Sequence, residues 1–278
     1  TFQDMSQSPL KCSIMAYPAT TVSNVISGTT YRGIEIKNET LAQDVTLEKR
    51  SFAGINNIPY LFGSYTIGTG AVLTIAPGVV CKFYNNGTIT VNKGLLALGE
   101  ASADSNIVFT SYRDDFYGGD TNADSTASYP YADSWTGISF GNYSLAPYSE
   151  LRHCIFRYGG YYTYSGVVTT NSASPTIEYC SFTDNTIGIL TKVSSNPVIN
   201  YCDFNDNNYF GIKNENTSST INAMYNWWGN NSGPTHADNP GGSGDIVSDG
   251  VNYSTWLSDN AFNPLMGDVS LNGTVQAY

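Results

Sequence analysis

Oxygen-bearing side chains are concentrated between residues 113 and 135, in the stretch RDDFYGGDTNADSTASYPYADSW. Within this stretch, Asp120, Asn122 and Asp124 alternate with other residues, and Asp115 lies five positions upstream. The alternation places three side-chain oxygens on one side of a tight loop, and carboxylate and amide oxygens are the ligands that Ca²⁺ prefers. These four residues therefore form a candidate calcium site, and a solvated acidic loop is the alternative.

The acidic loop departs at two positions from the calcium loop of helix–loop–helix proteins. Ser125 stands at the sixth position, where a glycine makes the sharp turn, and Tyr131 stands at the twelfth, where a glutamate binds the ion through both oxygens. We therefore expect a calcium site in this loop to be looser than the standard one.

A second calcium motif lies in GDVSLNGTVQAY at 267–278. Asp268, Ser270 and Asn272 occupy positions one, three and five, followed by a glycine at position six, and this pattern resembles the start of a type I dockerin calcium loop. The acidic twelfth position and a second repeat do not follow in the sequence. We therefore interpret 258–278 as a linker and a truncated dockerin-like segment.

Four tyrosines gather in RYGGYYTYSG at 157–166. They are Tyr158, Tyr161, Tyr162 and Tyr164. A tyrosine combines a flat apolar ring with a polar hydroxyl, and exposed rings of this kind stack on sugar rings. These residues form the candidate carbohydrate-binding site, and packing of the rings against the protein itself is the alternative.

The elements that position these loops are internal repeats. The stretch NPVINYCDFNDNNYFGIKN at 196–214 repeats SPTIEYCSFTDNTIGILTK at 174–192, about twenty-two residues apart. A weaker copy, LRHCIFRYGG, precedes them, and a fading one, TINAMYNWWG, follows. Periods of this length indicate stacked repeats, in which each unit buries its apolar face only against its neighbours.

Each repeat unit reads as short strands and polar corners. Apolar runs such as IGIL alternate with Asp-Asn corners and glycines, and the helical spacing of apolar residues is absent from 151–226. The sequence therefore predicts an all-β solenoid, a parallel β-helix. Its strands would stack about 4.8 Å apart, so that equivalent residues form columns along the axis.

The five cysteines are Cys12, Cys81, Cys154, Cys180 and Cys202. Three of them occupy the same repeat position, so we expect them to stack as small buried apolar side chains. An odd total also leaves one thiol without a partner. We favour unpaired core cysteines over a ladder of disulfides, and the two histidines and the cysteine spacing predict no zinc site.

Two carboxylates, Asp184 and Asp206, occupy the same position in successive copies. Their stacking about 5 Å apart would allow a catalytic pair of a glycoside hydrolase. The same position is also a solvent-facing corner, which favours Asp and Asn for conformational reasons. We interpret the pair as a corner and assign no catalytic residues, because no carboxylates recur with a basic partner as a pectate-type lyase requires.

Composition limits the partners. The chain has 278 residues with 27 Gly, 21 Tyr and a net charge of −11, so nucleic acid and anionic membranes are disfavoured, whereas a neutral polymer or a divalent cation is compatible. The sequence contains no run of 18 apolar residues, so it predicts no membrane-spanning helix.

The series LTIAPGVVCKF, ITVNKGLLALGEASADSNIVFTS, NPVINYC and YNWWGNNSGPTHADNPGGSGDIVSDGVNYSTWL resembles right-handed parallel β-helix proteins of the pectin-lyase-like superfamily, especially secreted bacterial β-helix repeat proteins. The resemblance covers 59–257, where we expect the β-helix with a long loop at 113–135. Residues 1–58 are expected to form a cap or irregular first coils.

The resemblance leaves several functions open, because that superfamily includes polysaccharide lyases, hydrolases, adhesins and structural stalks. We expect a non-catalytic structural or adhesive module, outside the cell or on its surface. Its expected partner is a polysaccharide or cell-surface glycan, or copies of itself stacked end to end. A calcium-dependent polysaccharide lyase or a glycoside hydrolase is the alternative.

Overall fold

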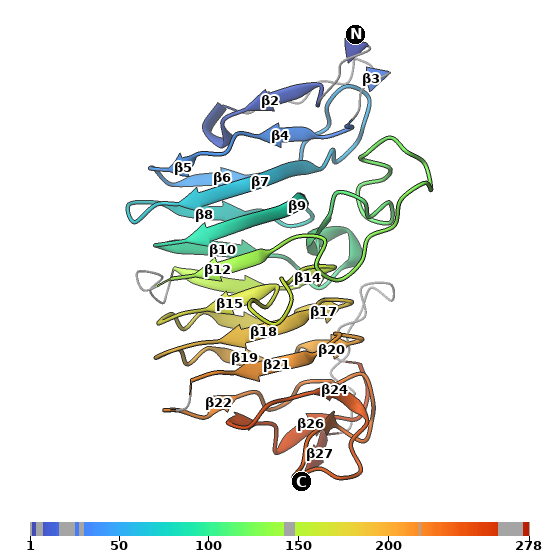
Figure 1. The fold of residues 1–278 in the computed structure, drawn as a ribbon. Helices are drawn as coiled ribbons and strands as arrows, with labels where there is room; N and C mark the ends of the chain where they lie inside the picture. The colour runs from blue at the N-terminus through green and yellow to red at the C-terminus, as the bar shows by residue number, and fades with distance from the viewer. Residues whose placement is uncertain are drawn as a thin grey trace.

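Short parallel strands wind around one axis and stack into a rod (Figure 1). The computed structural model describes residues 2–3, 8–16, 26–27, 31–141, 148–216, 218–260 and 275–277. From β2 to β25 the paired strands are parallel, and the pair β26 and β27 is antiparallel. The parallel β-helix predicted from the repeats is confirmed, and so is the right hand that the resemblance implied.

One face of the rod is a six-stranded sheet. The repeats at its C-terminal end are in register, with Leu151 opposite Ile177 and Ile177 opposite Ile199, as the aligned sequence copies predict. Its strands in spatial order are β6 (Val45–Leu47), β8 (Val72–Ile75), β10 (Gly94–Leu98), β13 (Ser149–Arg152), β16 (Thr176–Glu178) and β19 (Val198–Asn200).

Two further stacks complete the coils. The second contains β11 (Ile107–Ser111), β14 (Cys154–Arg157), β17 (Ser181–Thr183) and β20 (Asp203–Asn205), and the third contains β12 (Gly137–Phe140), β15 (Val168–Thr170), β18 (Ile187–Thr191) and β21 (Phe210–Asn214). The long strand β9 (Val80–Val91) pairs with β11 and with β12, the first strands of both stacks, and on its other edge with the long strand β7 (Tyr60–Ile67). The corner between the second and third stacks carries the two long loops, 112–136 and 158–167.

The solenoid begins before residue 59. The strands β4 (Ile34–Ile36) and β5 (Thr40–Leu41) pair in parallel with β7, and β2 (Leu10–Cys12) pairs with β4. The remaining elements are β1 (Phe2–Gln3), β3 (Ile26–Ser27), η1 (Ile14–Ala16), η2 (Ala103–Ser105), β22 (Ile221–Asn222), β23 (Pro234–Thr235), β24 (Gly244–Ile246), β25 (Val251–Asn252), β26 (Thr255–Leu257) and β27 (Val275–Ala277).

Columns of identical side chains fill the core. Phe156, Phe182 and Phe204 are fully buried, and their rings stack at 4.9 and 5.0 Å with interplanar angles of 6°. Trp228 continues the column over Phe204 at 5.0 Å and covers its C-terminal end. Stacked aromatic pairs contribute about 0.5–1.5 kcal/mol each beyond the burial of their area, so this column is a principal source of stability.

Three of the cysteines, Cys154, Cys180 and Cys202, share a repeat position and are buried one above the other, as expected. All five cysteines are free thiols, and Cys81, which is also buried, is paired with Phe109. The Sγ atom of Cys180 lies 3.4 Å from the carbonyl oxygen of Leu151, and that of Cys202 lies 3.5 Å from the carbonyl oxygen of Ile177. Each thiol thus donates weakly to the backbone of the preceding coil.

The Asp-Asn corners of two successive repeats adopt the left-handed backbone conformation. Asp184 and Asp206 have φ of 58° and 57°, a conformation that Asp and Asn tolerate better than most residues. Beside them, Asn185 donates through Nδ2 to Oδ1 of Asn207 at 3.0 Å, forming an asparagine ladder. The corner residues therefore follow from backbone conformation.

Among the described residues, no helix is long and apolar enough to cross a membrane.

Candidate functional site

A buried lysine holds the root of the long loop 112–136. Lys82 on β9 is fully buried, and its Nζ donates to the carbonyl oxygens of Asp114 and Gly119 at 2.8 and 2.7 Å and to the hydroxyl of Thr121. Burial lowers the pKa of Lys82 to about 8, opposed by the neighbouring carboxylates, first of all Asp114. The amine fixes the loop to the rod through three acceptors.

Asp114 is itself satisfied inside the protein. Its carboxylate accepts hydrogen bonds from the hydroxyl of Thr110 at 2.7 Å and from the backbone N–H of Phe116 at 3.1 Å. The guanidinium of Arg157 lies 3.8 Å away. Asp114 therefore belongs to the loop's anchor and is not open to a ligand.

The predicted calcium ligands converge above this anchor. Ligand oxygens of Asp115, Asp120 and Asp124 lie within 4.8 Å of one another. Asp120 accepts the backbone N–H groups of Asp124 and Ser125, each at 3.1 Å, which closes the tight turn that the D-x-N-x-D spacing predicts. Ser125, which replaces the expected glycine, has a φ of 61°.

Three oxygens of this group have no hydrogen-bond partner. They are the Oδ1 atoms of Asp115, Asn122 and Asp124, all shielded from solvent. Burial raises the pKa of Asp115, and the charges of Asp120 and Asp124 add to the effect. Shielded acceptors with clustered negative charge are the arrangement that a divalent cation would satisfy. The dockerin-like residues Asp268, Ser270 and Asn272 lie outside the described residues.

The tyrosine loop exposes three of its four predicted rings. Tyr161, Tyr162 and Tyr164 are 41%, 56% and 71% exposed. The rings of Tyr161 and Tyr162 lie edge to face at 4.9 Å. Tyr158 is partly buried and receives a hydrogen bond from Arg157, so it belongs to the base of the loop.

The long loop adds three exposed rings that the tyrosine motif did not indicate. Phe116, Tyr129 and Tyr131 are between 56% and 72% exposed. The guanidinium of Arg113 lies over the rings of Tyr112 and Tyr131 at 5.3 and 5.6 Å. The aromatic residues in FYGG and YPY were the available signal in the sequence, since they stand in a polar loop without a strand to bury them.

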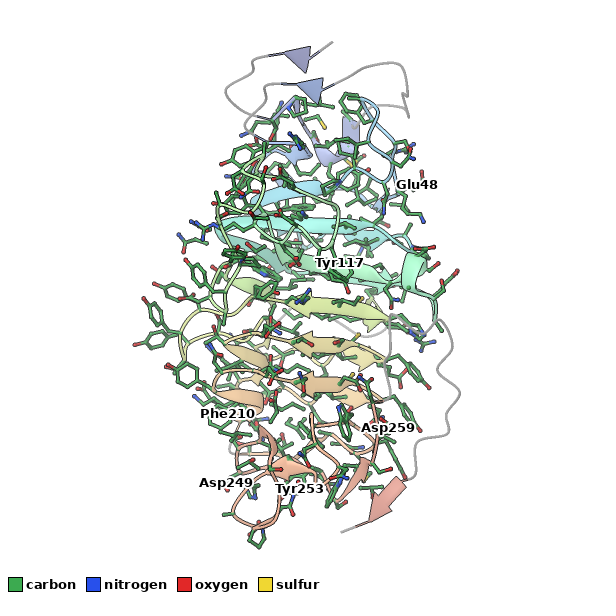
Figure 2. The ribbon with its side chains drawn as sticks, turned by 90° about the vertical axis from the view of Figure 1, so that its right-hand side faces the viewer. Glu48, Tyr117, Phe210, Asp249, Tyr253 and Asp259 are labelled. Carbon is green, nitrogen blue, oxygen red and sulfur yellow. The ribbon has the colours of Figure 1, made fainter. Side chains whose placement is uncertain are left out.

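The two loops contact each other. The N–H of Ser134 donates to the carbonyl of Tyr158 at 2.9 Å, and Trp135 forms a parallel bridge with Gly159. Arg157 reaches the first loop as well, with its guanidinium 5.9 Å from the ring of Phe116. We call the six exposed rings of these loops the aromatic platform: Phe116, Tyr129, Tyr131, Tyr161, Tyr162 and Tyr164. In Figure 2 the long loop, with Tyr117 labelled, faces the viewer, and side chains of the other loop project to the left.

The stacked carboxylates have structural partners. Asp184 lies 3.4 Å from the guanidinium of Arg157, and Asp206 accepts from the amide of Asn205 at 2.5 Å. Below them Asp245 on β24 ends the asparagine ladder, accepting from Nδ2 of Asn207 at 2.6 Å. Burial raises the pKa of Asp245 to about 7, and the charge of Asp206 contributes. A polar pocket of about 270 Å³ lies against Asp206 and Asp245.

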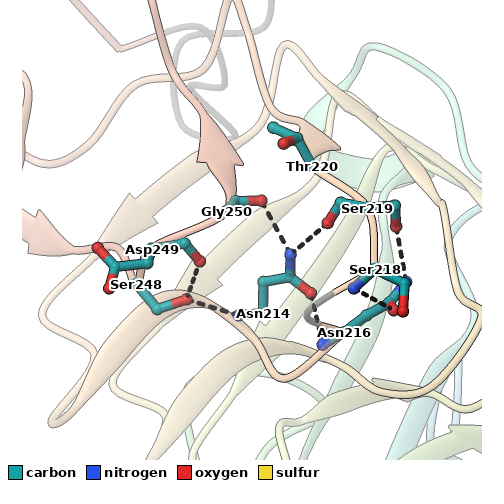
Figure 3. A pocket seen from close by; sticks show the side chains of 8 residues that line it. All are labelled: Asn214, Asn216, Ser218, Ser219, Thr220, Ser248, Asp249 and Gly250. Atoms are coloured by element: carbon teal, nitrogen blue, oxygen red, sulfur yellow. Dashed lines mark hydrogen bonds between the residues drawn. The ribbon is translucent and has the colours of Figure 1, made fainter.

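A larger polar pocket of about 620 Å³ lies beyond β21, and Figure 3 shows its lining. The amide nitrogen of Asn214 donates to the carbonyls of Ser219 and Gly250 at 3.0 and 2.9 Å, and that of Asn216 donates to the carbonyl of Ser195 at 3.0 Å. Because these amides bind the protein's own backbone, we interpret the pocket as a junction between loops.

Comparison with known proteins gives one match. A family model described as a right handed beta helix region matches residues 81–262, which include both loops and the repeats. Neither the curated proteins nor the solved structures contain a match. The match concerns the solenoid itself and does not specify a ligand for the aromatic platform or the acidic loop.

Proposed function

The chain belongs to the family of proteins with a right-handed β-helix region, and from this premise we propose that it is a rigid scaffold that binds a glycan through the aromatic platform without cleaving it. The observation that carries this proposal is the exposure of six aromatic rings on two contacting loops. Exposed tyrosines offer a flat apolar face with a polar tip, which suits the amphipathic faces of sugars.

Rigidity supports binding because a ligand then loses less free energy to the ordering of protein side chains. Lys82 and Arg157 hold the loop roots, and the β-helix positions both loops on one corner of the rod. The resemblance of the chain to the pectin-lyase-like superfamily agrees with a carbohydrate ligand and with a place outside the cell or on its surface. The net charge of −11 agrees with a ligand that is not an anionic polymer.

We further propose that Ca²⁺ braces the platform by binding Asp115, Asp120, Asn122 and Asp124. The three partnerless oxygens support this assignment. Carboxylate and amide oxygens suit Ca²⁺, and extracellular modules bind it with dissociation constants of about 10⁻⁴–10⁻³ M. Calorimetric titration with Ca²⁺ tests the site. Asp124→Asn is expected to weaken binding at least several-fold, whereas Asp104→Asn, an exposed carboxylate elsewhere, is the matched control. Equal affinities for the two variants would reject the assignment.

Affinity electrophoresis in neutral and acidic polysaccharides tests glycan binding. The double variant Tyr162→Ala/Tyr164→Ala is expected to lose about fivefold to a hundredfold in affinity, since each stacked ring contributes about 0.5–1.5 kcal/mol. Tyr148→Ala is the matched control, because Tyr148 is 45% exposed but lies outside both loops. Retention of affinity in the double variant, or an equal loss in the control, would contradict the proposal.

Glycoside hydrolysis is the second candidate. It is favoured by one observation, the raised pKa of Asp245 beside Asp206 in an open pocket, since hydrolases pair a protonated with an ionised carboxyl group. A structural role is the alternative for Asp245, because it accepts a hydrogen bond from Asn207 at the end of the asparagine ladder. Analysis of reducing ends after incubation with the same polysaccharides, comparing wild type with Asp206→Asn, distinguishes the two functions.

End-to-end assembly is less well supported at the C-terminal end. The backbone N–H of Tyr201 donates to the carbonyl of Tyr225, and Asp203 forms a parallel bridge with Trp227. The backbone of the last full coil is therefore already paired with the segment that follows it. Ile212 likewise forms a bridge with Val247. An edge that is already paired offers no template for a second copy.

A further inference from the structure

Hydroxyl side chains form a straight column on the outer face of β5, β7, β9 and β12, which follow one another down the rod (Figure 1). Thr40 is paired with Thr66, Thr66 with Thr90, and Thr90 with Ser139. The apolar residues beside each of them in the strand belong to the core, so these four side chains point outward. We call them the hydroxyl column.

The hydroxyl column is open to a ligand. Thr40 is exposed and the other three residues are partly exposed. Among the described residues, no protein group forms a hydrogen bond with any of the four hydroxyls, whereas the neighbouring hydroxyl of Thr88 donates to the carbonyl of Gly137 at 2.9 Å. A hydroxyl both donates and accepts, and none of the four residues is charged. The column therefore offers hydrogen bonds to an uncharged partner.

The spacing of the column suits an extended polysaccharide. Parallel strands lie about 4.8 Å apart, so the four hydroxyls span about 14 Å along the rod. A sugar unit in an extended chain has a length similar to one strand spacing, so successive units can each meet one hydroxyl. Each threonine also carries a methyl group beside its hydroxyl, and this pairing of apolar and polar groups matches the surface of a sugar ring.

The column ends at the tyrosine loop. The next residue in register is Thr169 on β15, whose hydroxyl accepts the N–H of Gly166 at 3.0 Å and donates to the carbonyl of Gly166 at 3.3 Å. The residue after it in register, Leu190 on β18, is fully buried. Ser139 therefore lies one strand away from the loop that carries three rings of the aromatic platform.

On the basis of the proposed glycan-binding function, we propose that the hydroxyl column extends the glycan site along the rod. A linear, uncharged polysaccharide with an extended backbone lies parallel to the axis. One end of the bound segment contacts the tyrosine loop, and the following units form hydrogen bonds with Ser139, Thr90 and Thr66. The ligand class is a neutral polymer of the cellulose or mannan type, and a chain that coils, as in amylose, leaves the column after a few units.

Oligosaccharides of two lengths test this inference. Cellobiose, cellohexaose, mannobiose and mannohexaose are titrated against the protein with isotope-labelled threonine methyl groups and followed by NMR, and maltohexaose serves as the coiled chain. Each added hydrogen bond contributes about twofold to tenfold in affinity. At least one extended hexaose should therefore bind about tenfold or more tightly than its dimer, and should shift the methyl signals of Thr66 and Thr90. Maltohexaose should bind no more tightly than the dimers.

Two double variants identify the surface responsible. Thr66→Val/Thr90→Val replaces two hydroxyls by methyl groups on a branched side chain that strands favour equally, so the rod is expected to fold. The affinity for the extended hexaose should fall about fivefold to a hundredfold, and that for the dimer should not change. Thr74→Val/Thr176→Val is the matched control, because both residues are partly exposed on the six-stranded sheet. It should leave both affinities as in wild type.

The outcomes separate this inference from the function on which it rests. Equal affinities for hexaoses and dimers, an unchanged affinity in Thr66→Val/Thr90→Val, or equal shifts at Thr74 and Thr176 would overturn the extended site and leave binding by the platform intact. Polysaccharide binding without binding of any of these oligomers would do the same. Shifts at Thr66 that follow protein concentration alone would assign the face to a second copy of the chain and overturn the inference. No binding of oligomers or polysaccharides overturns both.

Discussion

Asp245 provides the most quantitative prediction, because it ends a ladder of neutral amides with a charge. Asn185 and Asn207 fill the same position in the preceding coils, and Asp245 accepts from Asn207 as a further asparagine could. Its pKa is raised from 3.8 to about 7, chiefly by burial. The charged form is thus less favourable in the folded protein than in the unfolded chain.

The sign of the pH dependence follows from proton binding. Between about pH 4 and pH 7 the folded state holds a proton on Asp245 that the unfolded state has released. The contribution of this group to stability is therefore complete below about pH 4 and is lost as pH rises through about 7. Three pKa units correspond to about 4 kcal/mol, and we expect about 2–4 kcal/mol because Asp245 retains contact with solvent.

The substitution Asp245→Asn removes this titration while keeping an acceptor for Asn207. Thermal unfolding of wild type and variant, measured by calorimetry from pH 4 to pH 8, should give similar midpoints at the acidic end. At pH 8 the variant should melt several degrees higher, since about 1 kcal/mol corresponds to roughly 2–4 °C for a chain of this size. Asp206→Asn should show a smaller effect of the same sign, and Asp104→Asn should show none.

Two results would refute this reasoning. A difference between variant and wild type that is constant across the pH range would mean that Asp245 does not titrate in it. A variant less stable than wild type at pH 8 would mean that the carboxylate makes a stabilising contact that the amide cannot replace.

Three further predictions concern the rod and the loop anchor. Phe182→Ala should lower the free energy of unfolding, measured by urea titration, by about 3–5 kcal/mol, and Phe182→Leu should lower it by clearly less. Equal losses in the two variants would argue against the aromatic column. Lys82→Met leaves two carbonyl acceptors without their donor, so limited proteolysis should cut within 113–135 faster than in wild type, and an unchanged rate would mean that the lysine does not hold the loop. A thiol reagent should modify at most Cys12 in the native protein and all five cysteines in denaturant, whereas rapid native labelling of the others would contradict their burial.

The solenoid was predictable because its side chains repeat at fixed positions. Phe182 aligns with Phe204 in the repeated sequences, and the two residues are also paired in the structure. This agreement arises because parallel strands in register stack equivalent residues. The first coils before residue 59 lack the Cys and Phe positions of the repeat. The sequence therefore left open whether residues 1–58 form a cap or irregular first coils.

The loops were predictable in part. The D-x-N-x-D spacing predicted that carboxylates converge in this loop, because residues so close in sequence are brought together by a single turn. The role of Lys82 depends on partners 32 to 39 positions away, and Ser134 and Tyr158 are 24 positions apart, which no local pattern specifies. For the same reason the sequence did not show that the loop carrying Tyr129 and Tyr131 contacts the tyrosine loop.

The proposal that the aromatic platform binds a glycan without cleaving it is tested most directly by hydrogen–deuterium exchange with and without a binding polysaccharide, with the sugar recovered for product analysis. Our account predicts slower exchange within 113–135 and 157–166 and an intact polysaccharide. Slower exchange confined to the pocket beside Asp206 and Asp245, or shortened polysaccharide chains, would contradict it.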